Sequence, residues 1–210
     1  MTPSSYFSKQ SRKPSGLFGK YIMSAVFDIG NDFLNTFACD LLSIQSDDHI
    51  LDIGCGTGKL IDHLSRQVRD GYLEGIDYSR TMVSKARRRN KKNIEIGKVK
   101  ITEGDFDHLA YKDNVFNKIS SVNTVYFWPQ PELTSQKVSK ILKPGGLFVV
   151  AFEDMKQLER RNLNKEIFHL YTADDVMGLL ANSGFSPDIC LESRSKRNQV
   201  FHCVVAKTKT

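Results

Sequence analysis

The sequence contains few cysteines, and none of them forms a recognisable pair. The four are Cys39, Cys55, Cys190 and Cys203. There is no C-x-x-C motif, and no cysteine has the spacing expected of a zinc ligand. The sequence therefore predicts neither a disulfide scaffold nor a metal site. We expect four reduced thiols in a cytoplasmic protein, because disulfides are rare in that compartment.

Long apolar runs are also missing. None approaches the roughly 20 residues that a membrane-spanning helix needs, so no membrane span is predicted. The N-terminus lacks the apolar stretch of a secretory signal. Its Ser, Lys and Arg residues are typical of an organelle transit peptide, but Pro14 and Gly16 interrupt any amphipathic helix there, which argues against that interpretation.

Acidic residues do not occur in the first 27 positions, which makes the N-terminus basic. The 210-residue chain carries a formal net charge of +6, and a second basic block extends over residues 87–92. Such a balance admits nucleic acid as a partner without requiring it. At the end of a helix, however, a basic block is usually solvated and complements the helix dipole. We expect a basic segment over residues 1–26 and a single domain over residues 27–210.

Three alternate glycines follow an apolar run and an acid in Leu51-Asp52-Ile53-Gly54-Cys55-Gly56-Thr57-Gly58. The apolar run predicts a short buried strand. The glycines allow a tight turn with no Cβ between the backbone and a ligand. A helix that begins near Gly58 would direct its free N–H groups at that ligand. Asp77, which ends the next predicted strand, can accept both hydroxyls of a ribose, so the pattern predicts a nucleotide site.

Two common nucleotide motifs do not fit this loop. The dinucleotide fingerprint G-x-G-x-x-G needs a glycine where this chain has Lys59. The phosphate-binding P-loop needs a glycine at Ile53 and a hydroxyl at Leu60 to hold magnesium. The loop is thus unsuited to a pyrophosphate.

The G-x-G-x-G loop with its preceding acid resembles motif I of the class I S-adenosylmethionine-dependent methyltransferases. Further segments agree with that family in order and spacing between roughly residues 48 and 153. They are Gly75–Ser79 with Met82, Gly104–Phe106, Ser121–Pro129 and Leu142–Leu147. The chain resembles small-molecule enzymes of the ubiquinone and menaquinone biosynthesis type, and the segment 171–185 resembles the last helix of small-molecule members of the family.

The resemblance implies that S-adenosylmethionine is bound as methyl donor and leaves as S-adenosylhomocysteine. It places the glycine loop beside the methionine part of the cofactor, Asp77 at the ribose and Asp105 at the adenine. The matching positions of this chain are Asp52, Gly54, Cys55, Gly56, Gly58, Asp77, Tyr78, Met82, Asp105, Phe106 and Asn123. Simpler roles stay open for some of them: Asp77 could cap the next helix, Met82 could be core, and Asp105 could stabilise a turn.

Strand and helix patterns alternate along the chain after an N-terminal helix expected at residues 27–42. The expected strands are 50–53, 72–77, 99–104, 115–123 and 147–152, and the expected helices are 59–68, 80–90 and 131–142. A helix capped by Thr172 and Asp175 and a hairpin of residues 188–193 and 200–207 follow. Alternation predicts an α/β fold with helices on both faces of a parallel sheet. The resemblance adds a Rossmann-like strand order, 3-2-1-4-5-7-6, with strand 7 antiparallel.

The segment after the fourth predicted strand bears on the methyl acceptor. It contains no (Asn/Asp)-Pro-Pro-Tyr, which argues against methylation of adenine N6 or of glutamine, and no Pro-Cys, which argues against cytosine C5. The chain has no paired-glutamate loop of the kind found in arginine methyltransferases. Tyr126 and Trp128 are candidates for an aromatic pocket wall, and the alternative is an ordinary core cluster. Asn123 and His169 are further pocket candidates, although a histidine there is more often a surface residue. No residue is compelling as a catalytic base.

The N-terminal segment has the features of a lid. Leu17 and Phe18 provide an apolar face, and Gly16 and Gly19 provide hinges; the alternative is a mobile tail. Taken together, the sequence predicts transfer of a methyl group to a small molecule by in-line displacement, in a site that mainly aligns the reactants and excludes water. An RNA methyltransferase and a non-catalytic cofactor-binding protein remain the alternatives, and the oligomeric state stays open.

Overall fold

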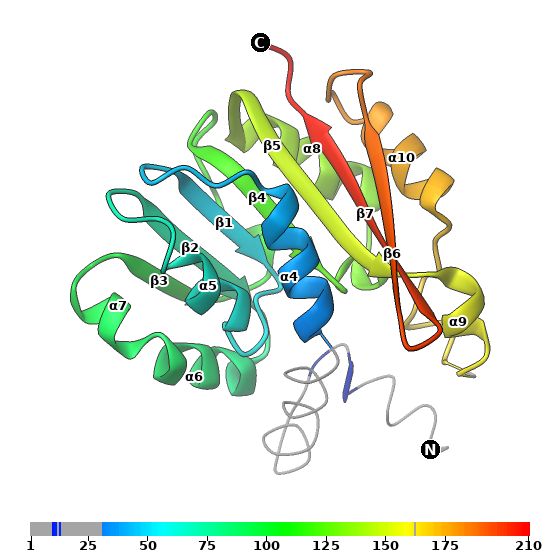
Figure 1. Cartoon of the computed structure of the whole chain (residues 1–210), viewed down its shortest axis with the longest axis horizontal. Coiled ribbons are helices and arrows are strands. Elements are labelled where there is room, and N and C mark those ends of the chain that lie inside the picture. Colours follow the sequence, from blue (N-terminus) through cyan, green and yellow to red (C-terminus); the bar gives the residue numbers. More distant parts are fainter. Residues whose placement is uncertain (1–9, 12, 14–30, 162) are drawn as a thin grey trace.

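The computed structural model describes residues 10, 11, 13, 31–161 and 163–210. The chain alternates between strands and helices, as Figure 1 shows. The strands are β1 (His49–Ile53), β2 (Tyr72–Asp77), β3 (Val99–Glu103), β4 (Phe116–Val122), β5 (Leu142–Glu153), β6 (Cys190–Lys196) and β7 (Gln199–Lys207). The helices are α4 (Asp32–Leu41), α5 (Lys59–Leu64), α6 (Arg80–Arg89), α7 (Lys91–Glu95), α8 (Pro131–Ile141), α9 (Met155–Glu159) and α10 (Ala173–Ala181), with single 3-10 turns η2 (Phe106–His108) and η3 (Val125–Phe127).

These strands form one seven-stranded sheet in the order β3-β2-β1-β4-β5-β7-β6. The first five strands pair in parallel, whereas β7 pairs antiparallel with both β5 and β6. The predicted Rossmann-like order is therefore confirmed. Because the chain leaves β1 toward β2 and later returns to place β4 on the other side of β1, the strand order reverses there. Open α/β sheets bind ligands at this switch point, outside the carboxyl ends of the strands.

Helices cover both faces of the sheet, and each face has its own hydrophobic core. One core joins α4, α5 and α6 to the sheet, and the other joins α8 and α10 to the opposite face. Strand β5 divides between them, since Leu147, Val149 and Ala151 belong to the first core and their neighbours Phe148 and Val150 to the second. This alternation follows from the two-residue period of a strand. A central strand buried on both sides holds its carboxyl end firmly.

Local signals in the sequence explain several element ends. Thr172 and Asp175 form the predicted capping box of α10: the Thr172 Oγ1 accepts from the Asp175 N–H at 3.1 Å, and the Asp175 carboxylate accepts from the Thr172 N–H at 2.8 Å. The β6–β7 hairpin turns at Arg197 and Asn198, which both have positive φ angles, as two-residue hairpin turns of this hand require.

The structure also differs from the sequence prediction in places. Helix α5 ends at Leu64 rather than at residue 68, and β5 begins pairing at Leu142 rather than at Leu147, through the bulged register that joins Phe116 to Leu142. The short helices α7 and α9 were not predicted, since neither is long enough to show helical periodicity. In the part of the chain that the structure describes, no helix has the length and apolar character to cross a membrane.

Candidate functional site

The glycine loop joins β1 to α5, and each of its three glycines has a left-handed backbone conformation. Gly54, Gly56 and Gly58 have φ angles of +72°, +53° and +72°, a region that disfavours residues with a Cβ. The loop is fastened to the neighbouring strand because the N–H groups of Gly54 and Cys55 donate to the Ile76 carbonyl at 2.8 and 2.9 Å. The backbone is thus held in a fixed curve at the carboxyl end of β1.

The three glycines have different surroundings. A Cβ at Gly56 would meet no atom within 4 Å, and Gly56 lines a cavity. A Cβ at Gly58 would lie 2.8 Å from the Ala86 Cβ and 2.7 Å from the Asn90 Nδ2, and Gly58 does not line the cavity. Gly58 directly precedes α5 and lets that helix approach α6, while its predicted contact with the cofactor stays a prediction.

Two carboxylates, one buried and one partly buried, flank the loop. Asp52, at the end of β1, is 3% exposed and accepts a hydrogen bond from the Ser120 hydroxyl at 2.8 Å. Asp77 accepts from the Gly56 N–H at 2.9 Å through one oxygen and from the Ser79 N–H at 2.8 Å through the other. Burial raises the pKa of Asp52 to about 7 and that of Asp77 to about 6, although the hydrogen bonds oppose the shift. Each carboxylate oxygen keeps a lone pair for a ligand donor.

The first turn of α6 forms the next part of the wall. Ser79 caps this helix by accepting from the Met82 N–H at 3.4 Å, which leaves Asp77 free of that task. Tyr78 and Met82 both line the cavity, and Met82 is 1% exposed, so it belongs to the core and to the wall together. The ammonium group of Lys13 lies 4.9 Å from the centre of the Tyr78 ring.

The loop after β3 carries Asp105 and Phe106, which also line the cavity. The Asp105 carboxylate accepts from the Asp107 N–H at 3.1 Å and lies 3.4 Å from the His108 Nδ1. Asp105 therefore stabilises the η2 turn, as the simpler interpretation of its sequence position allowed, while remaining at the cavity. Phe106 is buried in the core beneath.

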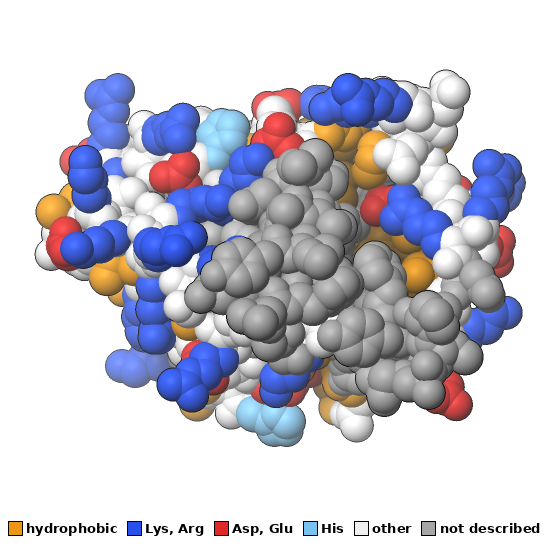
Figure 2. All heavy atoms as spheres, turned by 90° about the horizontal axis from the view of Figure 1, so that it is seen from below, with side chains coloured by type: hydrophobic (Ala, Val, Ile, Leu, Met, Phe, Trp, Pro, Cys, Tyr) orange, Lys and Arg blue, Asp and Glu red, His pale blue; other side chains and the backbone are white. Residues whose placement is uncertain are grey.

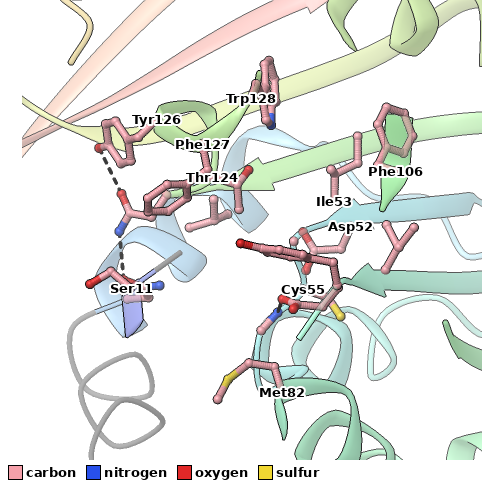
Figure 3. Close-up of a pocket in the computed structure, with 18 of the residues that line it drawn as sticks. Ser11, Asp52, Ile53, Cys55, Met82, Phe106, Thr124, Tyr126, Phe127 and Trp128 are labelled. Atoms are coloured by element: carbon pink, nitrogen blue, oxygen red, sulfur yellow. Dashed lines mark hydrogen bonds between the residues drawn. The ribbon is translucent and has the colours of Figure 1, made fainter. Parts of the chain in front are cut away.

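A hydrogen-bonded chain crosses the end of β4, as Figure 3 shows. The Asn123 side chain donates to the Asn31 Oδ1 at 2.8 Å and accepts from the Tyr126 hydroxyl at 3.2 Å. The same hydroxyl accepts from the Glu153 N–H at 2.6 Å. Burial raises the pKa of Tyr126 well above its usual value. Tyr126 thus joins β4 to β5 and is unsuited to act as a base.

The aromatic residues after β4 serve both the core and the cavity. Tyr126 and Trp128 are 3% and 6% exposed, and Trp128 stacks on Phe148 of β5. Both nevertheless line the cavity, so the two interpretations of these rings are combined in one arrangement. Phe127 packs against the core and is partly exposed at the cavity. In Figure 3 these rings lie across the cavity from Asp52, Cys55 and Met82.

Of the other predicted pocket residues, His169 lies away from the cavity and Phe18 is not described. His169 is exposed and is not part of the cavity lining; its backbone N–H donates to the Tyr126 carbonyl at 3.0 Å. His169 therefore lies where the alternative interpretation placed it, at the surface, rather than in the pocket. Phe18, with Leu17, lies outside the described residues.

The structure adds residues that sequence reasoning missed. The cavity, of about 520 Å³, extends from the glycine loop to an apolar region near α9. Its lining there includes Leu158, Leu163, Phe168 and Phe201 together with an ion pair, in which the Arg161 guanidinium donates to both Glu153 oxygens at 3.2 and 2.5 Å. Only the position of Glu153, at the carboxyl end of a buried strand, could have indicated its role. The others come from the short helix α9, from irregular segments or from β7.

Comparisons with known proteins agree with this geometry. A family model described as "Methyltransferase domain" matches residues 44–202. The chain belongs to that family. The methyltransferase is 30% identical to YrhH of Bacillus subtilis over 54% of its own length and 62% of YrhH, so it covers less than two thirds of that relative. It is 26% identical to the uncharacterized methyltransferase YdaC of the same organism, over 89% of its length and 96% of YdaC.

A solved structure shows the same fold. A chain of the complex between the Haloferax volcanii Trm112 methyltransferase activator and a methyltransferase matches with a TM-score of 0.82 and 16% identity, over 100% of both chains. The family uses S-adenosylmethionine, and the protein is an S-adenosylmethionine-dependent methyltransferase.

The described residues fit that cofactor. Gly56 leaves open space where any other residue would place a Cβ, so a ligand can approach bare backbone. Asp77 offers acceptor lone pairs for ribose hydroxyls, and Asp52 offers a carboxylate for an amino group. Among the described residues, no three His, Cys, Asp or Glu side chains come together in a group that could hold a metal ion.

Proposed function

We propose that this methyltransferase acts on a small molecule, which binds in the apolar region of the cavity beyond the glycine loop. The observation that carries the proposal is the division of one cavity into two parts. The part around Gly56 and Asp77, called the donor part because the methyl donor is proposed to bind there, presents backbone and carboxylates. The part around Phe127 and Phe168 presents aromatic and aliphatic side chains. A cavity of about 520 Å³ is of the size that encloses small ligands.

The names of other relatives support a small acceptor. They include a sterol 24-C-methyltransferase of Neurospora crassa, 24% identical, and a fatty-acid O-methyltransferase of Mycolicibacterium smegmatis, 26% identical. The chain covers 41% and 44% of these proteins, so their acceptors indicate only a class. An apolar region close to the donor part suits acceptors of that kind.

The proposed mechanism is in-line displacement. When bound, the cofactor supplies an electrophilic methyl group on a positively charged sulfur. Asp77 would hold the ribose and Asp52 the amino group, which fixes the direction in which that methyl group points. Tyr126, Phe127 and Trp128 would exclude water and present aromatic faces, which attract a positive charge. Alignment of this kind can supply several kcal/mol of the barrier reduction, on the order of 7–11 kcal/mol in favourable cases.

Local contacts of the basic block argue against the RNA alternative. The Arg87 guanidinium donates to the Ile101 carbonyl at 3.1 and 2.9 Å, and Arg89 donates to the Thr57 carbonyl and hydroxyl at 3.1 and 2.6 Å. These two arginines are therefore engaged with the protein itself. Figure 2 shows Lys and Arg side chains on one face of the molecule, with acidic side chains among them.

The test is transfer of an isotopically labelled methyl group in extracts. Purified protein would be incubated with labelled S-adenosylmethionine and separate small-molecule, RNA and protein fractions. We expect label in the small-molecule fraction. Label in RNA or protein would refute the proposal, and binding of S-adenosylhomocysteine without label in any fraction would favour the non-catalytic alternative.

We also propose that residues 27–210 form one domain preceded by a basic segment, 1–26. The support is that the described residues from 31 onward contribute to a single sheet and its two cores. Cooperative unfolding of a 27–210 fragment in a single transition would be expected, and two separated transitions would contradict it.

A cytoplasmic location is proposed on the state of the thiols. All four cysteines are free, and Cys39, Cys55 and Cys203 are buried. Fractionation of cells with an antibody against the protein tests this proposal; recovery in an organelle or outside the cell would contradict it.

A further inference from the structure

The loop after β3 needs support from outside itself. Gly104, Asp105, Phe106 and Asp107 all line the donor part of the cavity. The loop contains only the single 3-10 turn η2, and so short a turn cannot satisfy most of its own carbonyl groups. Carbonyls that are partly removed from water are stabilised by partners outside the turn. Whatever supplies those partners also fixes one wall of the cavity.

The partner is Lys137 of α8. Its ammonium group donates to the backbone carbonyls of Phe106, of Asp107 at 3.1 Å and of Leu109 at 2.6 Å. An ammonium group has three N–H donors, so these three carbonyls can use all of them. The ring of Phe106 lies 4.6 Å from the same nitrogen, and the ring of Tyr111 lies 5.9 Å from it. Burial lowers the pKa of Lys137, which shows that the group is partly removed from water.

A second side chain of α8 also holds the loop after β3. Thr134, three residues before Lys137 and therefore on the same side of α8, donates its hydroxyl to the Asp107 Oδ1 at 2.8 Å. Helix α8 is itself anchored in the core by Val138 and Ile141. The loop is thus attached to a rigid element at two points, although it lies outside the sheet.

We propose that Lys137 is a positioning residue that sets the donor part of the cavity by holding the backbone of residues 106–109. This inference rests on the proposed function, in which the cofactor lies against that loop. Lys137 does not itself line the cavity. It acts through the loop, so its loss should widen or displace the Asp105–Asp107 wall while the sheet and both cores stay intact.

The experiment compares three variants of the full chain by calorimetric titration with S-adenosylhomocysteine. Lys137→Met keeps the length of the side chain and removes its donors, Lys137→Arg keeps the charge and donors, and Lys140→Met changes an exposed lysine of the same helix as a matched control. Hydrogen exchange of the 106–109 amides, without ligand, serves as a second measurement.

We expect Lys137→Met to weaken binding by about tenfold to a hundredfold, as the loss of hydrogen bonds to a charged donor implies, and to accelerate exchange in residues 106–109. Lys137→Arg should recover most of the affinity, and Lys140→Met should behave as the wild type. Wild-type affinity and exchange in Lys137→Met would overturn the inference. So would a Lys137→Met protein that fails to fold, since the lysine would then be a general stability element. If the wild type itself did not bind S-adenosylhomocysteine, the proposed function would fail first.

Discussion

Substituting alanine at Gly56 and at Gly58 should separate ligand binding from folding within one motif. Both glycines have positive φ angles, so alanine at either position should cost about 1–2 kcal/mol of backbone strain. Only Gly58 is crowded: its new Cβ would lie 2.8 Å from the Ala86 Cβ and 3.0 Å from the Ala86 Cα. Overpacking of this kind adds about 1–3 kcal/mol.

The free energy of unfolding should therefore fall by about 2–5 kcal/mol in Gly58→Ala and by about 1–2 kcal/mol in Gly56→Ala. For a chain of this size, each kcal/mol lowers the melting temperature by about 2–4 °C. Thermal unfolding without ligand, followed by circular dichroism, measures the difference between the two variants.

For ligand affinity the order should be reversed, with Gly56→Ala losing more than Gly58→Ala. A Cβ at Gly56 would project into open space beside the cavity, where the ligand is proposed to contact the backbone. If that overlap costs about 1–3 kcal/mol, affinity for S-adenosylhomocysteine falls about fivefold to a hundredfold. Gly58→Ala, titrated at a temperature where it is folded, should bind within about twofold of the wild type. The reasoning is refuted if Gly56→Ala binds normally, or if folded Gly58→Ala does not bind.

Four further outcomes are expected. Asp77→Ala should lose about tenfold to a hundredfold in affinity for S-adenosylhomocysteine, since hydrogen bonds to a charged acceptor are worth about 1.5–3 kcal/mol; unchanged calorimetric binding would contradict this. Because burial raises the pKa of Asp52 to about 7 and of Asp77 to about 6, the folded protein without ligand binds more protons than the unfolded chain between about pH 4 and pH 7. Its free energy of unfolding should thus decrease as pH rises through that range, while affinity for S-adenosylhomocysteine increases. Denaturant titrations measure the first quantity and calorimetry the second; if neither quantity changed with pH, the prediction would be contradicted. Trp128→Ala should reduce methyl transfer far more than cofactor affinity, because it opens a pocket wall to water; a variant that merely unfolds would assign the ring to the core alone. Turnover should survive a chelator, and activity lost with the chelator and restored by one divalent ion would reveal a metal site.

The fold was largely predictable, because strands and turns depend on local patterns. The run before Gly54, the acid at the end of β2 and the capping box at Thr172 each specify an element through neighbours in the sequence. The strand order could not be predicted from local patterns. Periodicity predicts a hairpin at the end of the chain but not where it joins the sheet, so the predicted order came from family resemblance.

The donor part of the site was more predictable than the acceptor part. Motif residues such as Asp52 and Asp77 lie at strand ends, where the fold brings them together. Arg161 and Phe168 instead come from irregular segments after β5, whose path no local pattern determines. Gly58 and His169 show a related limit, since a motif position or a residue type does not reveal which way a group faces.

The placement of two residue types makes the protein suited to spectroscopic study without added mutations. Trp128 is the one tryptophan in the chain, and it lines the cavity, so its fluorescence should respond directly to an occupant. Cys190 is the one cysteine that is exposed, and it begins β6 at the outer edge of the sheet, three strands beyond β4. A dye attached there would accept energy transferred from Trp128 while leaving the cavity unobstructed. The wild-type chain thus already contains a donor at its binding site and an attachment point at its margin.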